Sequence, residues 1–282
     1  MTSIFKRKHL FYYLAIIPSL VIIGLFISPL ILTFYYAFTD IRGNITLGTL
    51  NSVIADPVFS ASYMRVIIYF ILNILIKFLL ATGAALCLRH PFKGRRILSA
   101  LNFAPYAFPM IPLYFDWFLM YHPSWGVIPY MIRSLGLTPP NFLTDPNLAM
   151  YFVCIAHAWA ATPLWTMIMT CGITSVPEEA YESAKIDGAT PTRMFFKITI
   201  PYIKKYLLMN ALLSCIWVTG EVTSVWLMTR GGPGTSSHIL ASYAYLQLYT
   251  GYYNKAAAML TLGIPLVVFL MFLLSRVLAM ED

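Results

Sequence analysis

The sequence predicts an all-α, polytopic membrane protein with six transmembrane helices in a single domain, residues 1–282. Of its residues 59% are hydrophobic and only 11% are charged, whereas globular chains carry about 25% charged residues. Six apolar runs approach or exceed the roughly 20 residues that are needed to cross a bilayer. Lysine and arginine gather in alternate connections between these runs, which is the pattern of a multi-span protein.

The predicted spans follow one another with short connections. The first run is too long for a signal peptide, whose apolar core has about 7–15 residues, so we expect an uncleaved span. The third span contains three prolines, and each removes a backbone hydrogen bond that neighbouring groups must replace. The spans are 10–39, 66–88, 97–121, 148–173, 206–228 and 256–274.

The connections differ in character. Residues 40–64 form a polar loop, and residues 89–96 form a basic turn. The loop 122–147 is rich in proline and aromatic residues, and we expect a short interfacial helix at 128–135. The loop 229–254 is polar, and its Gly231-Gly232-Pro233-Gly234 sequence predicts a turn.

Thirteen of the 19 lysines and arginines lie on the side of the N-terminus, five lie on the other side, and Lys77 lies within a span. Cytoplasmic loops are enriched in Lys and Arg, so we expect both termini and the segment 175–201 to be cytoplasmic. The thirteen are Lys6, Arg7, Lys8, Arg89, Lys93, Arg95, Arg96, Lys185, Arg193, Lys197, Lys204, Lys205 and Arg276, and the five are Arg42, Arg65, Arg133, Arg230 and Lys255.

The segment 175–201 is the longest polar interruption of the chain. Ser175 and Glu178 have the spacing of a capping box, in which each side chain bonds the backbone amide of the other. Ala180 and Ala184 fall on one face of the expected helix and keep that face shallow. Gly188 is expected to end the helix, because glycine readily adopts a positive φ.

A second short helix is expected after this corner. Thr190 precedes Pro191, and proline is favoured at the first position of a helix. Pro201 is expected to end this helix before the next span. The pattern therefore predicts two short helices with a tight corner outside the bilayer, a shape suited to docking into a cleft on another protein.

The same segment carries a family resemblance. Glu182-Ser183-Ala184, Gly188 and Ile198-Thr199-Ile200-Pro201 have the order and spacing of the EAA loop, which reads E-A-A, three residues, Gly, nine residues and I-x-L-P. Ser183 replaces the second Ala of that pattern and Ile200 its Leu. The chain thus resembles the permease subunits of binding-protein-dependent ABC importers, and Ile186-Asp187-Gly188-Ala189 resembles their carbohydrate branch.

Further segments extend the resemblance over roughly residues 60–280. The T-x-G-G-P element at 229–233 resembles the first of the two unlike permease subunits, which implies a heterodimeric pore. The other matching segments are 104–109, which resembles L-P-Y-A-x-P, and the outer-loop stretches 123–128 and 145–149.

The resemblance implies roles for residues and partners. The segment 175–201 would be the coupling helix that seats in the ATPase. Two ATPase subunits would bind ATP and Mg, a second permease subunit would complete the pore, and a solute-binding protein would deliver a sugar or oligosaccharide. The chain itself would hold no cofactor or metal and would be no enzyme. The implied coupling residues are Glu179, Ala180, Glu182, Ser183, Ala184, Asp187, Gly188, Ala189 and Pro201.

Polar side chains inside the spans are the candidates for a substrate path. Ionisable groups in a membrane are costly and usually face the bundle interior or a watery path. A structural pair, for example an acid with Lys77, is the alternative explanation of the acidic residues, and single aromatic residues in spans are more often packing or interface anchors. The candidates for a sugar path are Tyr106, Asp116, His157, Trp159, Trp217 and Glu221.

Missing motifs count against several other classes of function for this chain. The sequence lacks a G-x-x-x-x-G-K-[ST] phosphate-binding loop and an H-E-x-x-H metal motif. The net charge of +8 is distributed by topology, so we expect a lipid bilayer and no nucleic acid as its partner. The expected location is the bacterial or archaeal cytoplasmic membrane. The alternatives are an ABC importer of polyol phosphates, polyamines or amino acids, an ATP-independent secondary transporter, and a membrane-embedded enzyme.

Overall fold

The computed structural model describes the backbone of residues 2–279, with side chains from residue 18 onward and those of residues 14 and 16. The tail through Asp282 and the side chains of the basic segment 1–9 lie outside the described residues. The described chain is helical without a named strand, which confirms the all-α prediction. Its helices are α1 (Thr2–Ala37), α2 (Gly48–Ile54), α3 (Pro57–Arg89), α4 (Arg95–Ala107), α5 (Met110–Met120), α6 (Val127–Ser134), α7 (Ala149–Thr174), α8 (Glu178–Ile186), α9 (Pro191–Met194), the π-helix η1 (Phe195–Thr199), α10 (Ile200–Thr219), α11 (Thr223–Met228), α12 (Leu240–Tyr249) and α13 (Tyr253–Ala279).

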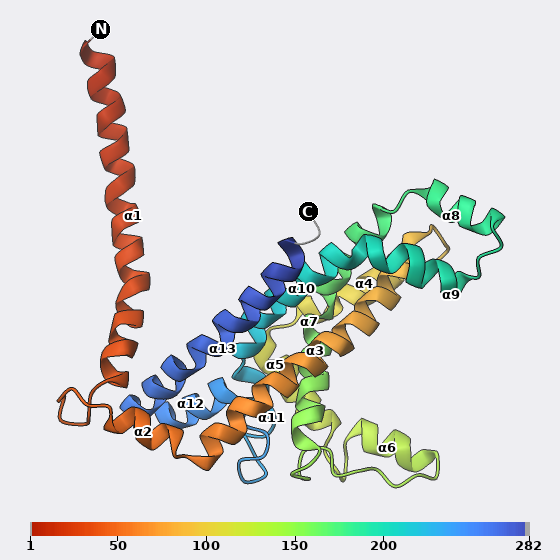
Figure 1. Ribbon diagram of the computed structural model, residues 1–282. Coiled ribbons are helices and arrows are strands. Elements are labelled where there is room, and N and C mark those ends of the chain that lie inside the picture. Colours follow the sequence, from red (N-terminus) through yellow and green to blue (C-terminus); the bar gives the residue numbers. More distant parts are fainter. Residues whose placement is uncertain (1, 280–282) are drawn as a thin grey trace.

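The long helices run between two ends of the molecule. Figure 1 shows α8 and α9 at the same end as the start of α1 and the end of α13, whereas α2, α6 and α12 lie at the opposite end. α3 packs along α7 in the centre, and their buried side chains include Tyr69 and Val153. α1 stands apart from this body and meets α13 near its own C-terminal end. The segment 175–201 therefore lies at the same end of the molecule as the start of α1 and the end of α13, as expected if all three are cytoplasmic.

Four described helices are long and apolar enough to cross a membrane, namely Pro18–Ala37 within α1, and α3, α7 and α13. α4 and α5 qualify only as a pair, and they are bent by 104° at their junction. Pro109 stands at this bend in an extended conformation, where its missing amide hydrogen leaves no helical bond unmade. The predicted third span is thus a broken helix pair, and the count of six spans is not confirmed.

The predicted end of a helix at Pro201 is wrong. Pro201 occupies the first turn of α10, which follows η1 directly, so one helical segment runs from Pro191 to Thr219. Proline is accommodated there because the turn directly before it is π-helical, so the hydrogen-bond register changes at this point. The predicted fifth span 206–228 is also divided, because α10 ends at Thr219 and α11 begins at Thr223.

The connecting segments hold more helix than the sequence predicts. The predicted polar loop 40–64 contains α2 and the start of α3, which Asp56 caps by accepting a hydrogen bond from the amide of Val58 at 2.8 Å. Pro57 then occupies the first turn of α3. The loop 229–254 contains α12, which the sequence does not predict, whereas α6 falls where an interfacial helix is expected.

The glycine-rich turn after α11 folds around a buried histidine. Gly231 has a φ of +83°, and His238 is 1% exposed. Arg65 of α3 donates to the carbonyl oxygens of Thr235 at 2.8 Å and His238 at 3.3 Å, which fixes the turn to the bundle. Burial, followed by the charge of Arg65, lowers the pKa of His238 to about 4, so the ring is neutral at pH 7.

Gly231→Ala should destabilise the protein more than Gly234→Ala. A Cβ on Gly231 would enter the His238 ring, whereas one on Gly234, which also has a positive φ, meets no atom within 4 Å. Both variants strain the backbone by about 1–2 kcal/mol, and overpacking adds about 1–3 kcal/mol at Gly231 alone. Thermal melting of the purified protein in detergent measures the difference. Equal melting temperatures would contradict this packing.

Candidate functional site

A cavity of about 600 Å³ lies between α4, α5, α7 and α10. Its size falls in the range of about 300–1,000 Å³ that is usual for small-molecule sites. It brings together four of the six residues predicted for a sugar path, from three separate parts of the chain. The lining residues are Pro105, Tyr106, Phe108, Met110, Leu113, Tyr114, His157, Ala160, Ala161, Leu164, Trp217 and Glu221.

Glu221 owes its position in the cavity to the break between α10 and α11. The carboxylate oxygen Oε1 accepts a hydrogen bond from the backbone amide of Ser224 at 2.6 Å, within the first turn of α11. The other oxygen, Oε2, lies 3.5 Å from Nε2 of His157 on α7. Glu221 therefore holds the start of α11 with one oxygen and faces the cavity and His157 with the other.

Two residues of α3, Tyr69 and Asn73, hold the ring of His157 in position. The amide nitrogen Nδ2 of Asn73 lies 3.0 Å from Nδ1 of His157, and the ring of Tyr69 stacks on the imidazole with centroids 5.7 Å apart. With Asn73 as donor, Nδ1 accepts and the proton resides on Nε2. This tautomer directs an N–H group toward Glu221, so Asn73, His157 and Glu221 form one polar chain at the cavity wall.

Lys77 takes no direct part in this chain. Its side chain is fully buried, and Nζ donates to the hydroxyl oxygen of Ser214 at 3.3 Å. Trp165 donates to the same oxygen at 2.9 Å. No ion pair within 4.0 Å joins Lys77 to Glu221 among the described side chains. The structural pair of Glu221 with Lys77 that the sequence left open is thus replaced by the contact with His157.

The other two predicted path residues lie next to the main cavity. Asp116 and Trp159 line an adjoining pocket of about 240 Å³, which shares Phe108 and Leu113 with the main cavity. Trp159 packs edge-on against Trp117 with centroids 5.4 Å apart. The structure thus places all six predicted residues around two adjoining spaces and groups Tyr106, His157, Trp217 and Glu221 in the larger one.

Two contributors to the cavity were missed from the sequence. Asn73 holds His157 at the cavity wall, but the two residues lie 84 positions apart and no local pattern reveals their pairing. Tyr114 lines the cavity from α5 and is 2% exposed. In the sequence it stands within an apolar run, where nothing distinguishes it from a residue that only packs in the core. A signal for Asn73 was available in its position one helical turn from Lys77.

In the hairpin formed by α8 and α9, α8 ends at the glycine turn that the sequence predicts. Gly188 has a φ of +75°, its amide donates to the carbonyl of Lys185 at 3.0 Å, and the amide of Ala189 donates to Ala184 at 2.9 Å. These two bonds form a Schellman motif. Thr190 then caps α9 by accepting from the amide of Arg193 at 3.3 Å.

The predicted capping box at the start of α8 is wrong. Ser175 ends α7, and its hydroxyl donates to the carbonyl of Gly172 at 2.8 Å. Pro177 precedes α8 without a side-chain cap. Glu178 instead pairs with Arg89 at the end of α3, at 2.6 Å between Nη2 and Oε2.

The predicted coupling residues lie on this hairpin, except Pro201. Glu179, Glu182, Ser183 and Asp187 are exposed, together with Gly188. Ala180, Ala184 and Ala189 are half-buried, and Pro201 is exposed at the start of α10 beyond the hairpin. Glu179, Glu182 and Ser183 thus form an exposed face of α8 that is accessible to a partner, whereas Ala180 and Ala184 lie nearer the side of the buried Tyr181.

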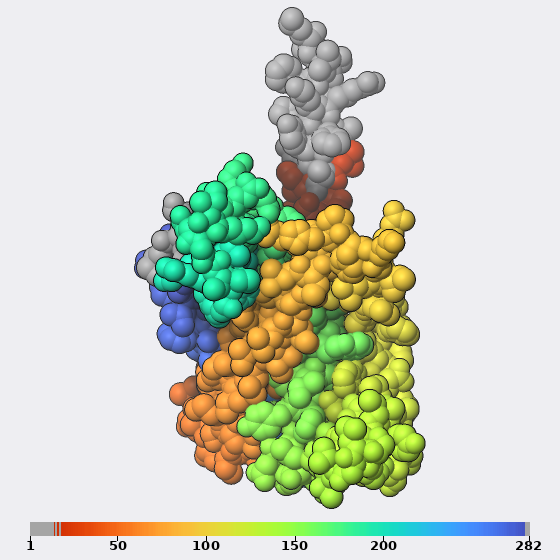
Figure 2. All heavy atoms as spheres, turned by 90° about the vertical axis from the view of Figure 1, so that its right-hand side faces the viewer, coloured from red at the N-terminus to blue at the C-terminus, as the bar shows by residue number. Residues whose placement is uncertain are grey.

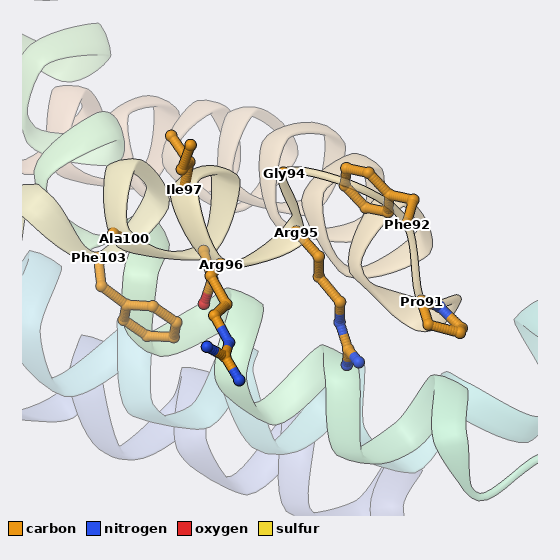
Figure 3. A pocket seen from close by; sticks show the side chains of 9 residues that line it. Pro91, Phe92, Gly94, Arg95, Arg96, Ile97, Ala100 and Phe103 are labelled. Atoms are coloured by element: carbon orange, nitrogen blue, oxygen red, sulfur yellow. The ribbon is translucent and has the colours of Figure 1, made fainter.

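A third cavity, of about 810 Å³, lies beside the basic turn between α3 and α4. Figure 3 shows the guanidinium groups of Arg95 and Arg96 extending to the same side, with the Phe103 ring on that side as well. Arg96, Phe103 and Tyr106 share one face of α4 by their spacing of seven and three residues. The face of α4 that lines the main cavity therefore continues to this basic end. Among the described residues, no group of three or more His, Cys, Asp and Glu side chains is arranged to hold a metal ion.

Comparisons with known proteins agree with one another. The family model described as "binding-protein-dependent transport system inner membrane component" matches residues 77–279. A probable ABC transporter permease protein of Pyrococcus horikoshii is 32% identical over 92% of this chain and 93% of its own length. The trehalose/maltose transport system permease protein MalF of Thermococcus litoralis is 29% identical over 95% of this chain and 93% of its own.

Solved structures share the fold. A chain of a bacterial alginate ABC transporter, solved with an alginate pentasaccharide-bound periplasmic protein, has a TM-score of 0.80 over 96% of this chain and 94% of its own, at 20% identity. A chain of the MetNI methionine ABC transporter has a TM-score of 0.57 over 80% of this chain and 96% of its own, at 16% identity. At these identities the likeness shows the fold alone.

Proposed function

This chain belongs to the binding-protein-dependent transport system inner membrane components, the transport permease subunits of ABC importers, and we propose that it carries a sugar or oligosaccharide. One observation supports the substrate most strongly: the 600 Å³ cavity presents the aromatic side chains of Tyr106 and Trp217 beside the carboxylate of Glu221. Aromatic faces pack on the apolar face of a pyranose, and a carboxylate accepts strongly from its hydroxyl groups. The related MalF of Thermococcus litoralis is named for trehalose and maltose.

The proposed assembly has four kinds of subunit. A second, unlike permease completes the pore, and a solute-binding protein delivers sugar to the end that carries α2, α6 and α12. Two ATPase subunits bind ATP and Mg, and they dock on the α8–α9 hairpin of this chain and on the matching loop of the second permease. The exposed outer face of the hairpin and the coupling residues on it support this docking.

Reconstitution tests the proposed function. The permease pair, the ATPase and the binding protein are placed in liposomes, and uptake is measured against a panel of neutral sugars, acidic sugars, amino acids and polyamines. We expect ATP-dependent uptake of a neutral sugar that the binding protein recognises. Uptake of an amino acid alone, or sugar uptake without ATP, would contradict the proposal.

We propose six spans with both termini in the cytoplasm, in which α4 with α5 and α10 with α11 form the broken third and fifth spans. Reporter fusions at Gly94 and Gly188 should therefore read cytoplasmic, and fusions at Asn141 and Ser236 should read external. The basic residues and the shared end of the termini and the hairpin support this topology. An external signal at Gly188 would overturn both the orientation and the docking role of the hairpin.

A further inference from the structure

The α8–α9 hairpin joins the bundle in two ways. On one side the chain continues from α9 through η1 into α10 without a break. On the other side, among the described residues, α8 packs extensively on no other helix. Figure 2 shows the hairpin as a lobe beside the upper end of α3. A small set of side chains makes this second connection.

These side chains are Arg89, Glu178, Tyr181 and Thr199, which we name the Arg89 anchor. Arg89 of α3 forms an ion pair with Glu178, and its guanidinium carbon lies 4.3 Å from the ring centroid of Tyr181. Tyr181 is 7% exposed, and its hydroxyl lies 2.7 Å from Oγ1 of the buried Thr199 in η1. The anchor thus ties α3, α8 and η1 together at one point.

The chemistry of the anchor is specific for arginine. A planar guanidinium can stack on an aromatic ring and bind a carboxylate at the same time, which an ammonium group does poorly. The Glu178 side chain is 57% exposed, whereas that of Arg89 is 14% exposed. An exposed ion pair contributes little by itself, so the stacking on Tyr181 and the buried Tyr181–Thr199 bond are expected to dominate.

We propose that Arg89 is a positioning residue that transmits movement of the ATPase-docked α8 to α3 and from there to the substrate cavity; this rests on the proposed function. Tyr69 and Asn73 of the same helix hold His157 at the cavity wall. Asn73 lies about 24 Å from Arg89 along α3, at 1.5 Å per residue. α3 therefore joins the anchor to the His157–Glu221 contact as one uninterrupted helix.

The test uses the complete importer in liposomes and measures sugar uptake, ATP hydrolysis and co-purification of the ATPase. Arg89→Ala should leave the ATPase bound but lower the sugar taken up per ATP by roughly five- to tenfold, the lower part of the usual range of allosteric coupling. Tyr181→Phe should lower the same ratio, since it keeps the ring but loses the bond to Thr199. Lys93→Ala, an exposed cation in the neighbouring turn, is the matched control and should retain the ratio.

Arg89→Lys is the second variant, used if the Arg89→Ala permease fails to assemble into the importer. It keeps the charge but loses the stacking, and it should assemble and still lower uptake per ATP. Unchanged uptake per ATP in both assembled variants would overturn the proposal, and so would loss of ATPase binding in Arg89→Lys, because the role would then be structural. If the wild-type importer transports no sugar with ATP, the proposed function fails, which is a separate result.

Discussion

Gly188→Val should reduce ATP-driven uptake at least tenfold while the permease still inserts in the membrane. Gly188 has a φ of +75°, a conformation in which a β-branched residue is strongly disfavoured. Strain of about 1–2 kcal/mol or more opens the Schellman corner and turns α8 away from α9. Each 1.4 kcal/mol lost from docking weakens ATPase binding by about tenfold. Co-purification of the ATPase and sugar uptake measure the two effects.

Gly136→Val is the matched control at the opposite end of the molecule. Gly136 has a φ of +76°, and a Cβ at either glycine meets no atom within 4 Å. Both variants therefore strain the backbone equally without crowding a neighbour. We expect Gly136→Val to retain ATPase binding, which is the readout compared between the two variants. Equal loss of ATPase co-purification in the two variants would assign the effect to general instability and contradict the coupling role of Gly188.

The corner of the hairpin could be predicted because its causes are local. Gly188 satisfies the end of α8, and Thr190 with Pro191 begins α9, all within four residues. The bounds of α7 were predicted within one residue because a long apolar run has clear ends. The same local rules failed at Glu178, since its ion-pair partner Arg89 lies 89 positions earlier in the chain.

Breaks inside the spans could not be predicted from hydropathy. The apolar run continues across Gly220 and Glu221, although α10 ends there and α11 begins at Thr223. Pro201 gives the opposite case, because a residue that usually breaks helices stands in a continuous helical segment. Whether proline or glycine interrupts a membrane helix depends on which neighbours satisfy the freed backbone groups.

The candidate path could be predicted as a set of residues but not as a network. Intramembrane polar residues mark a path in general, and this pointed to His157 and Glu221. Their contact depends on how α7 is rotated against the break after α10. The packing of α3 against α7 and α10 places Lys77 beside Ser214 and Trp165 rather than beside Glu221.

Glu221→Gln should reduce sugar uptake by roughly 10- to 100-fold, since a hydrogen bond to a charged group contributes about 1.5–3 kcal/mol. Glutamine keeps an oxygen that can accept from the amide of Ser224, so the start of α11 is retained. It loses the charge that faces the cavity and His157. ATP hydrolysis stimulated by the binding protein should survive, because the hairpin and its docking face are unchanged.

Two further measurements complete the test of Glu221, namely the stability of Glu221→Ala and the uptake of an acidic sugar. Glu221→Ala removes the acceptor for Ser224 as well, and it should lower thermal stability where Glu221→Gln does not. A carboxylate in the cavity repels acidic sugars, so Glu221→Gln should also shift preference from neutral toward acidic saccharides. Wild-type uptake and preference in Glu221→Gln, combined with an unstable Glu221→Ala, would reduce Glu221 to a structural residue at the start of α11 and remove it from the sugar path.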